Sequence, residues 1–139
     1  MYFGIGTAQF DKNYGILKKS VKKRILKSFF SEINKSNKIK LIDTAPSYGN
    51  AEKQIGKMIN SGKRVSTKFL SFNPKTKKID LSFLKKSIDK SLKNLKKKKI
   101  DYLMFHDENE FIKSDKKILD YLKIQKKKWK NKKSRDINL

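Results

Sequence analysis

The sequence has no cysteine, one histidine, two prolines and three arginines among its 139 residues. Without cysteine the chain cannot form disulfides, thiolate metal sites or cysteine nucleophiles. No apolar run approaches the roughly 20 residues that span a bilayer, and the first residues lack the charged and then apolar pattern of a signal peptide. These absences predict a cytoplasmic protein with no membrane span, and the length predicts at most one domain.

The formal net charge of +24 comes almost entirely from lysine, because arginine occurs only at Arg24, Arg64 and Arg135. A basic chain can bind nucleic acid non-specifically. However, proteins that read bases or clamp phosphates tend to use the planar arginine fork, which is scarce here. Lysine, isoleucine, asparagine and phenylalanine share A- and T-rich codons, so an AT-biased genome accounts for the composition. We therefore expect no nucleic-acid partner. The less favoured alternative is a basic nucleic-acid-binding module.

Strand patterns alternate with helix patterns along the chain. We expect strands at residues 2–7, 40–44, 64–69 and 100–105, with no hairpin signal between them. A helix with apolar residues at spacings of three and four is expected after each strand. The apolar residues of the four helices are Val21, Ile25, Leu26, Phe29, Phe30 and Ile33; Ile55, Met58 and Ile59; Leu84, Ile88, Leu92 and Leu95; and Ile118, Leu119, Leu122 and Trp129.

The expected helix ends fit this division. Ser20, Asp80 and either Ser114 or Asp115 are the expected N-caps, and the pair at 61–62 (Ser-Gly) is expected to end the second helix. Four strand–helix units in succession predict an α/β fold of parallel strands joined by right-handed crossovers.

Four reactive side chains lie at or just past the ends of three of these strands. Asp43 closes the second strand and Tyr48 follows it in the next loop. Lys68 lies near the end of the third strand, and His106, the only histidine, follows the fourth. A parallel α/β barrel builds its active site at the carboxyl ends of its strands.

The four groups suit proton transfer to an oxygen that is becoming an alkoxide. A phenol with a pKa near ~10 is a weak acid at neutral pH unless a cation lies beside it. Lys68 could be that cation for Tyr48, and Asp43 could hold the ammonium in place. His106 could orient a carbonyl or share the proton. These groups supply no reductant, so a hydride-carrying cofactor is implied.

Each of these residues also has an ordinary structural interpretation. Asp43 could be only a helix cap, Tyr48 a packed loop residue, Lys68 one lysine among many, and His106 a structural histidine. Their coincidence at three consecutive strand ends favours the functional interpretation.

Several segments resemble the aldo-keto reductase family in order and spacing. The resemblance covers about residues 2–128 and implies the N-terminal half of a (β/α)8 TIM barrel. The segments are Gly4-x-Gly6-Thr7, Asp43-Thr44-Ala45-x-x-Tyr48-Gly49 with Ile55-Gly56 after it, Ser66-Thr67-Lys68, and Asp101-Tyr102-Leu103-x-x-His106.

The resemblance also implies a function. The family reduces aldehydes or ketones reversibly with NADP or NAD as cofactor, so the expected partner is a small carbonyl substrate, with no metal. Tyr48 would be the general acid, Lys68 would make its phenol a stronger acid, and Asp43 would hold Lys68. His106 would orient the carbonyl, while Thr7 and Asp43 would lie near the nicotinamide ribose.

Half of such a barrel is missing from the expected elements. A whole barrel takes about 250 residues and eight strands, whereas four strands are expected here. In the resembled family most cofactor contacts follow the later strands, so we expect this chain to be inactive or incomplete alone. The alternative is a non-catalytic half-barrel or assembly subunit. An open sheet leaves free edges and an uncovered apolar face, which predicts self-association or pairing with a separately encoded C-terminal half.

Residues 129–139 show no strand pattern and are expected to form a tail unlike the family. Read one base later from the codon of Trp129, with permitted codons, this tail spells a Gly-Lys-Ile-Lys turn and a fifth strand. A frameshift near Trp129 is therefore our hypothesis for the tail, and the nucleotide sequence would test it.

Overall fold

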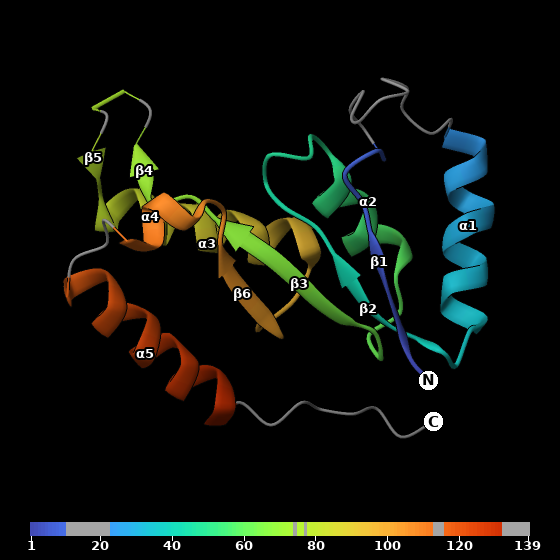
Figure 1. Ribbon diagram of the computed structural model, residues 1–139. Helices are drawn as coiled ribbons and strands as arrows, with labels where there is room; N and C mark the ends of the chain where they lie inside the picture. Colours follow the sequence, from blue (N-terminus) through green and yellow to red (C-terminus); the bar gives the residue numbers. More distant parts are fainter. Residues whose placement is uncertain (11–22, 74, 77, 113–115, 132–139) are drawn as a thin grey trace.

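The computed structural model describes residues 1–10, 23–73, 75–76, 78–112 and 116–131. Its main sheet has four parallel strands in chain order, β1 (Phe3–Gly6), β2 (Ile39–Asp43), β3 (Arg64–Phe69) and β6 (Tyr102–Phe105). The helices are α1 (Lys23–Lys35), α2 (Ala51–Met58), α3 (Leu81–Leu95), α4 (Glu108–Ile112) and α5 (Lys116–Asn131). The predicted α/β fold with four parallel strands is confirmed (Figure 1).

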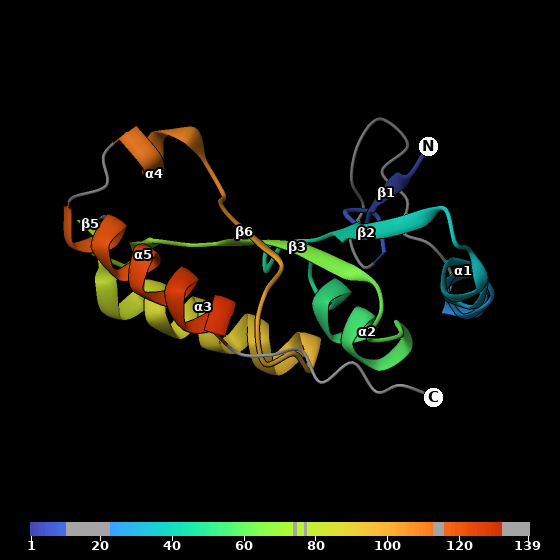
Figure 2. The ribbon, with the colours of Figure 1, turned by 90° about the horizontal axis from the view of Figure 1, so that it is seen from below.

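The four long helices cover one face of this sheet. Figure 2 shows α1, α2, α3 and α5 on that face, with α4 on the opposite side near the end of β6. Right-handed crossovers between parallel strands place helices in this way. Within the described residues no helix is long and apolar enough to cross a membrane.

The apolar core lies between the sheet and these helices. Alternate residues of a strand point to opposite faces, so Ile42, Val65 and Phe69 are buried beneath the helices. Asp43, Ser66 and Lys68 belong to the other set. Two clusters fill the helical side: Phe10, Leu26, Phe30, Ile33, Ile42, Ala51, Ile55, Val65 and Leu95 around α1 and α2, and Phe69, Leu84, Ile88, Ile100 and Ile118 around α3 and α5.

The strand register places the reactive residues at one end of the sheet. Asp43 of β2 is level with Gly6 of β1 and with Ser66 of β3. Lys68 lies two residues further along β3 and is level with Met104 of β6. The carboxyl ends of neighbouring strands therefore meet at a common edge, as the sequence predicted.

The expectation of no hairpin was wrong. A short antiparallel pair, β4 (Phe72–Asn73) and β5 (Lys78–Ile79), projects between β3 and α3. The backbone N–H of Asp80 donates to the Ser71 carbonyl at 2.9 Å and closes the base of this hairpin. Two residues per strand are too few to show an alternating pattern, so this hairpin could not be recognised from hydrophobic periodicity.

The helices differ from the expectation in one additional helix and one helix end, and the expected starts of two others lie outside the described residues. α4 was not expected; the Asp107 carboxylate accepts a hydrogen bond from the Asn109 N–H at 2.7 Å where this helix begins. α2 ends at Met58, before the Ser-Gly pair at 61–62, because the backbone of Ile59 is already extended. The proposed caps at residues 20, 114 and 115 and the apolar residue at 21 lie outside the described residues.

Asp80 is the N-cap of α3, as expected. Its carboxylate accepts hydrogen bonds from the backbone N–H groups of Ser82 at 2.7 Å and Phe83 at 3.3 Å. Hydrogen bonding from Ser82 is the main reason that the pKa of Asp80 lies below its ordinary value of 3.8. A carboxyl whose pKa is lowered on folding stabilises the protein above its unfolded pKa and loses that contribution as pH falls through the folded pKa.

This cap predicts a pH-dependent stability difference between the wild type and Asp80→Asn. Asparagine is also a good N-cap but does not titrate. We expect the wild type to have the higher melting temperature near neutral pH, because its carboxylate also favours the helix N-terminus. The difference should shrink as pH falls below about 3.8. Thermal melts followed by circular dichroism measure it, and a difference that does not change with pH would contradict the role of the charge.

Candidate active site

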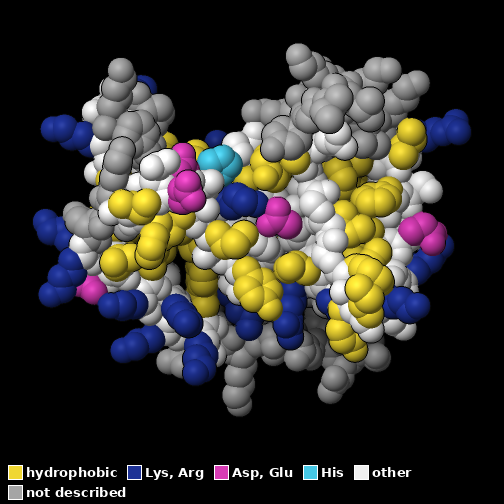
Figure 3. Space-filling view, viewed as in Figure 1, with side chains coloured by type: hydrophobic (Ala, Val, Ile, Leu, Met, Phe, Trp, Pro, Cys, Tyr) yellow, Lys and Arg dark blue, Asp and Glu magenta, His cyan; other side chains and the backbone are white. Residues whose placement is uncertain are grey.

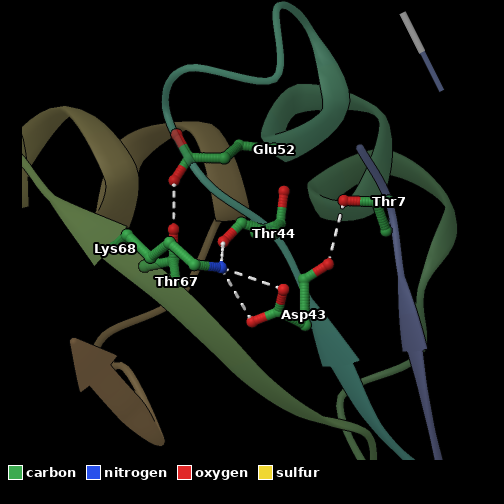
Figure 4. Close-up of polar contacts among 6 residues, drawn as sticks. All are labelled: Thr7, Asp43, Thr44, Glu52, Thr67 and Lys68. Atoms are coloured by element: carbon green, nitrogen blue, oxygen red, sulfur yellow. Dashed lines mark hydrogen bonds and ion pairs between the residues drawn. The ribbon is translucent and has the colours of Figure 1, made fainter. Parts of the chain in front are cut away.

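Lys68 and Asp43 form a partly buried ion pair at the end of β2 and β3. Lys68 Nζ donates to the two carboxylate oxygens of Asp43 at 2.9 and 3.1 Å and to the Thr44 carbonyl at 3.2 Å (Figure 4). The Lys68 side chain is 17% exposed and that of Asp43 is 35% exposed. Because water screens this pair less than a surface pair, the carboxylate holds the ammonium in one position.

The same ammonium lies over the ring of Tyr48. The distance from Lys68 Nζ to the ring centroid is 5.3 Å, within the range of a cation–π contact. The loop that carries Tyr48 is closed by backbone hydrogen bonds, from the Tyr48 N–H to the Ala45 carbonyl at 3.1 Å and from the Ala51 N–H to the Tyr48 carbonyl at 3.2 Å. Gly49 follows with φ of 65°, a left-handed conformation that glycine adopts without strain.

Thr7 fixes the end of β2 from the other side. Both its backbone N–H and its hydroxyl donate to the Asp43 carbonyl at 3.0 Å, and its side chain is fully buried. These bonds hold the backbone of Asp43 while its carboxylate turns toward Lys68 (Figure 4). The expected contact of Thr7 with a cofactor ribose stays a prediction.

His106 lies at the same end of the sheet as the other three groups, directly after β6. It is exposed and follows β6 directly, beyond the Lys68–Met104 pair of the β3–β6 register. Within the described part of the chain no hydrogen bond, ion pair or ring contact involves His106. The structure thus brings Asp43, Lys68 and Tyr48 into contact, while His106 is exposed at the same end of the sheet.

A hollow of about 880 Å³ lies between β6 and α5 and reaches Asp43, whereas Lys68, Tyr48 and His106 do not line it. Its polar lining includes Asp43 and Ser66 from the sheet, and apolar side chains of β6 and α5, such as Leu103 and Trp129, form much of its wall. The Ser66 hydroxyl is buried and has no hydrogen-bond partner within the described residues. Figure 3 shows hydrophobic side chains grouped over β1 and β6, with lysines toward the outer rim.

The hollow allows a test of whether the residues fit a nicotinamide cofactor. The Asp43 carboxylate can accept a hydrogen bond from a ribose hydroxyl, and the unpaired Ser66 hydroxyl can bond a carboxamide. The residues present therefore fit the nicotinamide end of such a cofactor.

Two residues near the site were not among the expected site residues, although Ser66 belongs to the Ser66-Thr67-Lys68 segment. Ser66 could have been found, because it lies two residues before Lys68 and strand alternation places both on one face. Glu52, which is buried behind β3, gave no signal, because a glutamate in the first turn of an amphipathic helix is ordinarily exposed.

Comparison with known proteins agrees with this geometry. The model of the aldo/keto reductase family matches residues 3–130. No curated protein sequence matches the chain significantly. The predicted boundary at residue 128 has not been tested, although α5 and the family match both extend past it.

Two solved structures from Pseudomonas aeruginosa, both provisionally named as aldo-keto reductases, share the fold. The first, PA4992, has a TM-score of 0.69 at 20% identity, over 91% of this chain and 51% of the other. The second has a TM-score of 0.64 at 20% identity, over 88% and 49%. The chain thus spans about half the length of these structures, and its four parallel strand–helix units are the N-terminal half of a (β/α)8 barrel, as predicted. Because the family model matches residues 3–130, which is most of the sequence, the chain belongs to the aldo/keto reductase family.

Proposed function

We propose that this chain carries the acid–base groups of an NAD(P)H-dependent reductase of aldehydes or ketones. The observation that supports this most is the position of Lys68 Nζ, which is bonded to Asp43 at 2.9 Å and lies 5.3 Å from the centre of the Tyr48 ring. A phenol, a cation and a carboxylate in contact are the parts that a proton donor to a carbonyl oxygen needs.

Each residue would have a distinct task in the reaction. A bound NADPH or NADH supplies the hydride that forms the new bond to the carbonyl carbon. The Tyr48 hydroxyl gives its proton to the carbonyl oxygen, which becomes the alcohol. The positive charge of Lys68 stabilises the phenolate left behind, and water returns the proton to it. Asp43 keeps Lys68 in place, and His106 orients the carbonyl from the neighbouring strand end.

The rest of the cofactor site would come from a second half-barrel. Because the chain spans about half of the solved structures that it resembles, activity is proposed for the completed barrel. The missing strand–helix units would be a second copy of the chain or a separately encoded half, and this pairing stays a prediction. The choice between NADPH and NADH stays open with it.

One observation favours a second candidate, a non-catalytic assembly subunit. Large hydrophobic side chains on β1 and β6 are exposed, Phe3 at 47%, Tyr102 at 45% and Met104 at 42%. Exposed apolar groups of this size on a sheet often mark a contact surface.

Binding of the cofactor separates the two candidates. Purified protein is titrated with NADPH up to millimolar concentration while the nicotinamide fluorescence is followed. The reductase proposal expects saturable binding that weakens in Asp43→Ala. The control is Asp120→Ala, which removes an exposed carboxylate paired with Lys123 on α5 and should bind like the wild type. No saturable binding by the wild type would exclude cofactor binding by this chain alone and would favour the assembly subunit.

A further inference from the structure

Glu52 is a buried carboxylate for which the proposed reaction has no use. Its side chain is 1% exposed, although glutamate is almost never fully buried unless it is paired. None of the ion pairs within the described residues involves it. Glu52 lies in the first turn of α2, where a negative charge is favoured by the helix dipole. Burying a carboxylate among neutral groups costs free energy unless specific hydrogen bonds compensate for the lost contact with water.

Those hydrogen bonds come from two other elements. Thr67 of β3 donates its hydroxyl to Glu52 Oε1 at 2.8 Å, and Asn94 of α3 donates its amide to Glu52 Oε2 at 3.1 Å. Figure 4 shows the bond to Thr67, with Glu52 on the helical side of β3. One carboxylate therefore joins α2, β3 and α3.

The contact between α2 and α3 leaves this carboxylate little freedom. Gly56 lies one helical turn after Glu52, on the same side of α2. A Cβ atom at Gly56 would lie 2.1 Å from the carbonyl oxygen of Asn94, so the two backbones are in close contact there. Asn94 thus meets α2 with both its backbone and its side chain, and Glu52 is held at a fixed distance from α3.

Glu52 is connected to the acid–base group through adjacent residues. Thr67 and Lys68 are consecutive in β3 and point to opposite faces of the sheet, Thr67 toward Glu52 and Lys68 toward Asp43 and Tyr48. The loop that carries Tyr48 leads directly into α2, whose second residue is Glu52. The carboxylate therefore restrains both the strand that carries the cation and the helix that follows the phenol.

We propose that Glu52 is a positioning residue that sets the placement of the Lys68 ammonium against the Tyr48 ring. This inference takes its meaning for catalysis from the proposed reductase function, but the geometry that it concerns can be measured without any turnover. If the proposed activity were absent, the positioning role of Glu52 could still be correct. If Glu52 did not position Lys68, the proposed activity could still be correct.

The test uses the nuclear magnetic resonance of the Lys68 side chain in the full chain. Protons of the Lys68 ε-methylene close to the Tyr48 ring should be shifted by the ring current. In protein with isotope-labelled lysine, the Lys68 signal is the one that disappears in Lys68→Arg. Tyr48→Leu gives the position of this signal without the ring, and the wild type gives its position with the ring in place.

Glu52→Leu removes both acceptors and keeps an apolar side chain of similar size. We expect the Lys68 signal to move more than halfway from its wild-type position to that of Tyr48→Leu. Combining Glu52→Gln with Asn94→Asp exchanges the donor and the acceptor of the hydrogen bond between residues 52 and 94. In this double variant the Lys68 signal should lie closer to its wild-type position than in Glu52→Leu. Thr67→Val removes one bond while keeping the shape, and it serves as the main variant if Glu52→Leu does not fold.

A control separates positioning from general loss of stability. Ile88→Val makes a small cavity in the other core cluster, around α3 and α5, and should lower the melting temperature without moving the Lys68 signal. An unmoved Lys68 signal in folded Glu52→Leu or Thr67→Val would overturn the proposal. An equal movement in Ile88→Val would also overturn it, because the effect would then be one of stability alone.

Discussion

Tyr48→Phe is expected to lower the rate of carbonyl reduction by a factor of about 10²–10⁴, the usual contribution of a positioned general acid. The variant removes only the phenolic oxygen and its proton. The ring remains, so its contact with the Lys68 ammonium at 5.3 Å from the centroid should persist and the loop should fold as before. The loss should therefore appear in the rate of alcohol formation, with cofactor binding little changed.

The rate is best measured in a single turnover, with the completed barrel and NADPH in excess over an electron-poor aldehyde. Tyr121→Phe is the matched control, because it makes the same chemical change on α5, where Lys85 of α3 lies over its ring. Burial raises the pKa of Tyr121, so this phenol stays neutral at the pH of the assay. Equal rates in Tyr48→Phe and the wild type would exclude Tyr48 as the proton donor.

Gly56→Ala is expected to destabilise the fold by about 3 kcal/mol, the upper part of the range for overpacking. The new Cβ would lie 2.1 Å from the Asn94 carbonyl oxygen and 2.8 Å from the Leu95 carbonyl carbon. Both are backbone atoms, so α2 and α3 would have to move apart. Alanine's higher helix propensity, worth about 1 kcal/mol, offsets only part of this cost.

Urea denaturation measures this change, with Gly62→Ala as the control. A Cβ atom at Gly62 would meet no atom within 4 Å, so that variant should unfold close to the wild-type midpoint. Unfolding of Gly56→Ala at the wild-type urea concentration would show that the two helices are not in close contact. It would also weaken the case for a fixed Glu52.

The parts of the fold that depend on hydrophobic periodicity could be predicted from the sequence. The apolar runs that became β2 and β3 are buried on the helical side at Ile42 and Val65, and α3 begins at its predicted cap, Asp80. The β4–β5 hairpin and α4 could not be predicted, because elements of two to five residues carry too little pattern. Local hydrogen bonds at Ser71 and Asp107 decide them instead.

The site divides in the same way. Asp43, Tyr48 and Lys68 could be placed together because strand ends in a parallel sheet share an edge. The orientation of His106 relative to these three residues could not be predicted, because His106 lies in a bend after the edge strand β6. Nor could the sequence show which of its many lysines are structural. Lys63 is buried and donates to the carbonyls of Ser36 and Ile39, and burial lowers its pKa.

We propose that Asp43, Lys68 and Tyr48 form the acid–base half of a carbonyl reductase. The decisive experiment uses a nicotinamide cofactor that carries deuterium at the transferable position, together with an aldehyde and the chain co-expressed with the C-terminal half of an aldo/keto reductase barrel. Mass spectrometry of the alcohol is sensitive enough for slow turnover. We predict one deuterium per alcohol formed by the wild type and a strong loss of labelled alcohol with Tyr48→Phe. No labelled alcohol from the completed barrel with the wild-type chain, or the same amount with Tyr48→Phe, would exclude this role of the three residues.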